Sequence, residues 1–153
     1  MARARLLALG CLLGSLALPA SWALPHGLSP AHAQADQKRS RVYLAELAML
    51  IEGARRLLLW TETYIGEPEF ARFAHPLAER YVDMAGRLVP PAKLLNAHPH
   101  LLMVVENVER ALEAAGNGDT SVFRQRARIV REELLILDSV LKQSKQRLPE
   151  LAR

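Results

Sequence analysis

Cysteine is almost absent from this chain, because Cys11 is the single one among 153 residues. We expect it to be removed with an N-terminal leader, which leaves a working protein without a thiol. Such a protein can form no disulfide bond and no thiolate metal site, and it cannot attach a c-type haem, which requires Cys-x-x-Cys-His. Thiol chemistry is therefore excluded from the expected function.

Histidine is scarce too, and the motifs that use it are missing. The chain has five histidines, of which His26 and His32 fall within the expected leader. No Glu-x-x-His motif occurs, although di-iron helical bundles place one on each of two helices. A b-type haem held by Met49 would need a histidine as its second axial ligand, and residues 120–149 contain none. We therefore expect no cofactor.

Motifs that position a nucleophile or a phosphate are also missing. The chain has neither Gly-x-Ser-x-Gly nor a glycine-rich phosphate loop. Ser121, Ser139 and Ser144 share their expected helix with no histidine that could activate them. We expect that this protein is not an enzyme.

The N-terminal segment has the pattern of a secretory signal peptide. Arg3 and Arg5 precede the apolar stretch Leu6–Leu18, and prolines and small residues follow it up to Ala35. The apolar stretch is shorter than the roughly 20 residues that a membrane-spanning helix needs. We therefore expect no stable membrane insertion once the leader is removed.

Two cleavage sites of the small-x-small kind stand in the leader. We favour cleavage after Ala35, because strong polarity begins at Asp36. This gives a signal peptide of residues 1–35 and a domain of residues 36–153, whereas the alternative cut follows Ala23. Either cut predicts a protein that is exported, to the periplasm or to the medium.

Charge and length bound the remaining protein. The leader holds two of the 20 basic residues and none of the 16 acidic ones, so its removal lowers the formal net charge from +4 to +2. A nucleic-acid site would need basic residues gathered on one face, and we expect no nucleic-acid partner. The remaining chain of about 118 residues is long enough for one domain with one core.

Apolar residues beyond the leader recur at spacings of three and four. This is the stripe of an amphipathic helix, and it predicts an all-α protein. Four such stripes occur: Leu44, Leu47, Ile51, Ala54, Leu58 and Ile65; Leu77, Tyr81, Met84 and Leu88; Leu101, Val105, Val108, Leu112 and Ala115; and Phe123, Ala127, Val130, Leu134, Leu137 and Leu141.

Glycine and proline separate the four expected helices. Pro76 leaves two alternatives for the second helix, which begins either at Pro76 or at Pro68 with a kink at Pro76. Four helices joined by modest loops predict an antiparallel up-down-up-down four-helix bundle. The breaks stand at Gly66-Glu67-Pro68, Pro90-Pro91, Gly116-Asn117-Gly118-Asp119-Thr120 and Pro149.

His98 and His100 are the sharpest candidates for metal ligands. The antiparallel order puts them at the end of the bundle where the chain starts, about 20 Å from His75 at the other end. The pair could hold a divalent ion weakly with a nearby carboxylate. Alternatively, His98 precedes the third helix, with Pro99 at its first position and His100 in its first turn. A His-x-His pair alone is below the usual ligand count for zinc.

Aromatic residues gather near the break between the first two helices. Trp60 and Tyr64 lie one turn apart on the first helix, and Phe70 and Phe73 follow the break. Aromatic residues at helical spacing usually pack together, so we expect these four to form a cluster. The alternative is that they line a groove for a partner or a ligand.

Charged residues form two stripes on the last two helices. We expect these stripes to pair across the antiparallel helices, with a basic docking face as the alternative. The acidic stripe is Glu106, Glu109 and Glu113, and the basic stripe is Arg124, Arg128 and Arg131.

These patterns favour one function and leave one alternative. The favoured function is that of an exported, non-enzymatic helical-bundle protein, which binds a partner protein or a small ligand in the cell envelope. The alternative is a protein that binds a divalent metal ion weakly through His98 and His100.

Overall fold

The computed structural model describes residues 30–149, with the side chains of residues 34–149. In this range the chain is helical and has no strand, so the all-α prediction is confirmed. Residues 1–29 of the expected signal peptide lie outside the described residues, whereas residues 30–35 belong to the start of the first helix. The helices are α1 (Pro30–Thr63), α2 (Pro68–Arg87), a short 3₁₀ helix η1 (Ala92–Leu94), α3 (His98–Gly116) and α4 (Thr120–Gln143).

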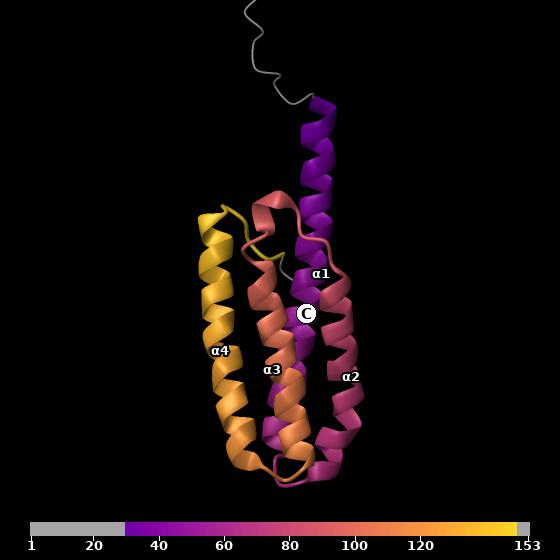
Figure 1. The fold of residues 1–153 in the computed structure, drawn as a ribbon, viewed down its shortest axis with the longest axis vertical. Helices are drawn as coiled ribbons and strands as arrows, with labels where there is room; N and C mark the ends of the chain where they lie inside the picture. Colours follow the sequence, from indigo (N-terminus) through magenta and orange to yellow (C-terminus); the bar gives the residue numbers. More distant parts are fainter. Residues whose placement is uncertain (1–29, 150–153) are drawn as a thin grey trace, which may run out of the picture.

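Consecutive α-helices run in opposite directions (Figure 1). The α1–α2 and α3–α4 turns lie at one end of the molecule, which we call the turn end. The η1 connection and the end of α4 lie at the other. None of the helices described in residues 30–149 is both long and apolar enough to cross a membrane.

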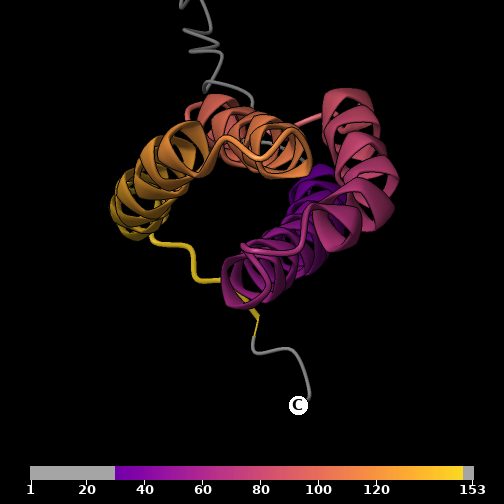
Figure 2. The same ribbon diagram turned by 90° about the horizontal axis from the view of Figure 1, so that it is seen from below.

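α3 is the central helix of the core. It packs against α2, against α4 and, in parallel, against α1. Leu101, Val105 and Leu112 on α3 are fully buried, and they lie in one apolar core with Leu47 of α1 and Phe123 of α4. α1 and α4, by contrast, do not pack along each other, and Figure 2 shows them apart on the side away from α3. The bundle is therefore open along one seam.

Of the two predicted starts of the second helix, Pro68 and Pro76, the structure has the first. The helix begins at Pro68 and continues through Pro76 to Arg87. Pro76 is exposed, so water can reach the carbonyl group that the proline leaves without its helical partner.

The turn from α3 to α4 has a strong local cause. Gly118 has a φ of 80°, a left-handed conformation that glycine adopts without strain. The NH groups of Gly118 and Asp119 donate to the carbonyl groups of Ala115 and Ala114, which closes the end of α3. Asp119 then caps α4, because its carboxylate accepts a hydrogen bond of 3.0 Å from the NH of Val122.

α4 ends earlier than the sequence predicts. We expect it to reach Pro149, but it stops at Gln143. The NH groups of Lys145 and Gln146 donate to the carbonyl groups of Lys142 and Leu141, which is the same closing pattern as at Gly118. Lys145 takes the left-handed position with a φ of 55°. The chain beyond it then crosses from α4 towards α1 (Figure 2).

Candidate functional site

The two histidines of the candidate metal pair lie at the start of α3 but bind different helices. His98 Nδ1 lies 3.1 Å from the Tyr43 hydroxyl on α1. His100 Nδ1 lies 2.8 Å from a Glu133 carboxylate oxygen on α4. Within residues 34–149, no group of three or more His, Cys, Asp or Glu side chains is arranged to hold a metal ion. The geometry therefore gives each ring an inter-helix contact.

His75 has a similar contact at the turn end. Its Nε2 lies 2.9 Å from a carboxylate oxygen of Glu109, which joins α2 to α3. Asn107 on α3 also accepts a hydrogen bond of 3.2 Å from Arg126 on α4. α3 thus has at least one polar contact with each of the other three α-helices.

The predicted pairing of the two charge stripes is wrong. Glu109 pairs with His75 on α2, not with an arginine on α4. Arg131 pairs with Glu62 on α1, and Arg128 with Glu132 on its own helix. The reason is that α3 turns its acidic side towards α2 and solvent, while Arg131 faces the open seam towards α1.

Burial changes the acid–base behaviour of the Tyr43–His98 pair. Tyr43 is only 3% exposed. Desolvation raises the pKa of the Tyr43 hydroxyl to about 12 and lowers the pKa of His98 below its usual value. Both shifts favour the uncharged pair, in which a hydrogen bond joins the Tyr43 hydroxyl to His98 Nδ1.

Three of the four aromatic residues form the expected cluster. The ring centroids of Trp60 and Phe70 are 5.3 Å apart, and those of Tyr64 and Phe70 are 4.6 Å apart. Trp60 and Tyr64 also meet edge to face. Phe73 does not join the cluster, because it lies on the outer side of α2 and is 82% exposed. The cluster holds the α1–α2 turn against the ends of both helices.

Trp60 and Phe73 both line a shallow apolar furrow between α1 and α2. Two adjoining hollows of about 500 and 520 Å³ make up this α1–α2 furrow. Leu57, Trp60 and Leu77 line both hollows. The four aromatic residues therefore do not surround one groove. Trp60 and Phe73 line the furrow, whereas Tyr64 and Phe70 line neither hollow.

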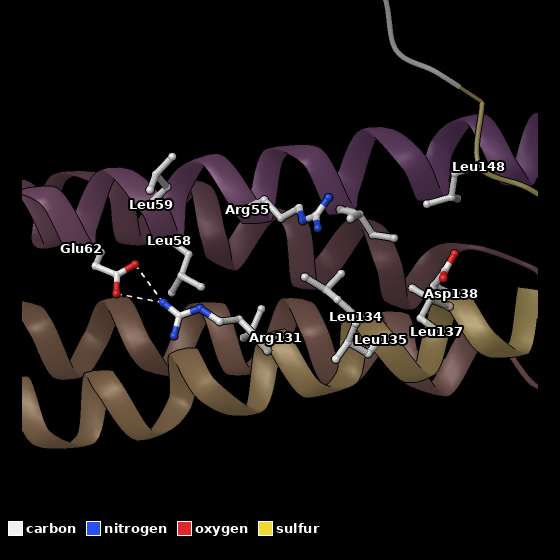
Figure 3. Close-up of a pocket in the computed structure, with 12 residues that line it drawn as sticks. Arg55, Leu58, Leu59, Glu62, Arg131, Leu134, Leu135, Leu137, Asp138 and Leu148 are labelled. Atoms are coloured by element: carbon white, nitrogen blue, oxygen red, sulfur yellow. Dashed lines mark hydrogen bonds and ion pairs between the residues drawn. The ribbon is translucent and has the colours of Figure 1, made fainter.

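The larger hollow lies on the other side of α1, along the open seam. We call it the α1–α4 groove, and its volume is about 610 Å³ (Figure 3). Its floor is buried and apolar, and its two lips carry Leu59 of α1, 65% exposed, and Leu135 of α4, 73% exposed. The lining residues are Ile51, Arg55, Leu58, Leu59, Glu62, Val130, Arg131, Leu134, Leu135, Leu137, Asp138 and Leu148.

An ion pair lies at one end of this groove and a leucine at the other. At one end Arg131 Nη2 lies 2.9 Å from both carboxylate oxygens of Glu62, so this ion pair bridges the two helices (Figure 3). Leu148, from the segment that follows α4, lies at the other end. Arg55 lies on α1 between the two ends.

The apolar stripes of the sequence do not predict this groove, although two unbroken apolar runs are a signal for it. Leu134-Leu135-Ile136-Leu137 on α4 and Leu57-Leu58-Leu59-Trp60 on α1 are runs of four apolar residues. A helix that faces one core needs a single stripe, so an unbroken run gives it a second apolar side. Except for Ile136, the residues of both runs line the α1–α4 groove or the α1–α2 furrow.

Comparisons of the chain with models of protein families, with curated proteins and with solved structures find no match.

Proposed function

We propose that this chain is an exported, non-enzymatic helical-bundle protein that binds a partner protein or a small ligand in the cell envelope. In this proposal the α1–α4 groove is the binding site. The observation that carries it is the open seam, where two apolar lips, Leu59 and Leu135, stand exposed above a buried apolar floor. Contiguous apolar surface of this kind marks binding sites in folded proteins.

The volume of the groove supports the proposal. Pockets for small ligands usually measure about 300–1,000 Å³, with mostly apolar walls and a few polar groups. The α1–α4 groove has about 610 Å³, and Arg55, Arg131, Glu62 and Asp138 are its charged lining residues. The α1–α2 furrow is the weaker candidate, since it lies between helices that pack against each other.

The placement of the histidines supports a non-enzymatic role. His75, His98 and His100 lie in three separate contacts, each with a side chain of another helix. Each contact uses a ring nitrogen to join helices, which is a structural task. Weak metal binding at His98 and His100 has less support, because their rings bind different helices.

The test is native mass spectrometry of the full chain purified from the envelope fraction of its own host. We expect the wild-type protein to carry a bound mass or partner, and the L59E/L135E variant to lose it. Both leucines are largely exposed, so the two charges should leave the fold intact.

The matched control is V89E, because Val89 is 87% exposed and does not line the groove. This variant should keep what the wild type carries. The proposal fails if the wild-type protein carries nothing, or if L59E/L135E keeps the same bound mass. Finding the chain only outside the envelope fraction would contradict export.

A further inference from the structure

We infer that the occupant of the α1–α4 groove is an amphiphile with one acyl chain and an anionic head group, and that Arg55 holds the head group. This inference rests on the proposed function, because it names the ligand class for the same groove. The groove dimensions, its burial and the pairing of its charges carry the argument.

The groove has room for an acyl chain that starts at Arg55. From Arg55 to Glu62 its α1 wall rises about 10 Å at 1.5 Å per residue, and the Arg55 side chain extends further, towards the Leu148 end (Figure 3). A chain whose head group lies at the Arg55 guanidinium would therefore run along the groove to the Glu62–Arg131 pair.

The walls of the groove suit a methylene chain. Ile51 and Leu58 on α1 face Val130 and Leu137 on α4, and all four side chains are buried. An acyl chain laid over them would cover the exposed lips, Leu59 and Leu135. Removing methylene groups from water favours binding, so an acyl chain laid along these walls is driven into the groove.

The charges of the groove favour an anion. Arg131 is already paired with Glu62, and Asp138 is paired with Lys142 at 2.6 Å. Arg55 pairs with no carboxylate among the residues that the structure describes. A carboxylate or phosphate head group would supply a counter-charge for Arg55.

Titration calorimetry with dodecanoate and with neutral 1-dodecanol, both below their aggregation concentrations, tests the inference. We expect one dodecanoate to bind per wild-type chain. R55Q should weaken dodecanoate binding about fivefold, which is the effect of one exposed ion pair, and should leave dodecanol binding unchanged.

R124Q is the matched control, because Arg124 is an exposed arginine on α4 that does not line the groove. It should bind both probes as the wild type does, whereas L59E/L135E should bind neither. Equal weakening in R55Q and R124Q would overturn the role of Arg55.

A failure here can be told apart from a failure of the proposed function. If dodecanoate does not bind but the purified protein carries a partner that L59E/L135E loses, the acyl inference is wrong and the groove remains a binding site. If dodecanoate does not bind and the wild type dimerises while L59E/L135E does not, the occupant is a second copy.

Discussion

At the scale of single residues, α3 and α4 end with the same hydrogen-bond pattern but with different residues in the left-handed position. Gly118 ends α3 and Lys145 ends α4, and both are left-handed, with φ values of 80° and 55°. Glycine carries no penalty in this conformation, whereas a residue with a side chain loses roughly 1–2 kcal/mol. The end of α4 is therefore strained where the end of α3 is not.

Lys145→Gly should consequently stabilise the protein. We expect the free energy of unfolding to rise by about 0.5–1 kcal/mol, since glycine relieves the strain but also gains freedom in the unfolded chain. Urea unfolding monitored by circular dichroism measures the change. Ser144→Gly is the control, because Ser144 has a φ of −78° and should gain nothing from glycine. An unchanged or lowered stability in Lys145→Gly would show that the left-handed residue is not strained.

At the scale of whole elements, the sequence predicts the helices better than their ends. Four helices and the break at Gly66-Glu67-Pro68 follow from the apolar stripes and the prolines. The end of α4 does not, because a lysine at the left-handed position has no compositional signal. The start of α1 at Pro30 is also missed, since residues 34–39 are exposed and the apolar stripe begins only at Leu44.

Side-chain contacts between elements are the least predictable part. The composition predicts polar contacts between helices, but the partners depend on the rotation of each helix about its axis. Arg131 pairs with Glu62 of α1 because Arg131 lies on the side of α4 that faces α1 across the open seam. The α1–α4 groove was missed for the same reason, since the stripes of a closed bundle would have covered it.

The Tyr43–His98 contact between α1 and α3 predicts a pH dependence. Because burial lowers the pKa of His98, the folded state binds fewer protons than the unfolded chain below the ordinary value of 6.5. The stability from the neutral ring is therefore complete above pH 6.5 and is lost as the pH falls towards the lowered pKa. The Tyr43 hydroxyl contributes in the opposite range, complete below pH 10 and lost as the pH rises towards 12.

The measurement is urea unfolding of the wild type and of His98→Asn between pH 4.5 and 7.5. This range extends about two pH units below 6.5, the ordinary pKa of histidine. Asparagine can still accept from Tyr43 but does not titrate. We expect the variant to lose less stability than the wild type on acidification. Parallel curves for the two proteins would mean that His98 titrates normally in the fold. His75→Asn serves as a comparison at a different inter-helix contact.

At the scale of the whole molecule, α1 extends beyond the part of the fold in which the four helices pack together. Its first turns project beyond the other helices (Figure 1). Residues 34–39 are exposed, and the first core residue within residues 34–149 is Tyr43. The cleavage that we expect after Ala35 would fall within the projecting part of α1 (Figure 1), before the described core begins at Tyr43. We therefore expect the fold of the described core to tolerate a start at any residue from Asp36 to Val42.

Truncation of α1 tests this expectation. A chain that begins at Val42 should unfold within about 0.5 kcal/mol of one that begins at Asp36, because the residues between them are solvent-facing and contribute little packing. A chain that begins at Leu44 should lose about 3 kcal/mol or more, since it lacks the buried aromatic ring of Tyr43 and leaves His98 without its partner. Urea unfolding of the three proteins at one pH gives both differences. A large loss already at Val42 would mean that the projecting turns carry stability, and the domain would then have to begin before residue 42.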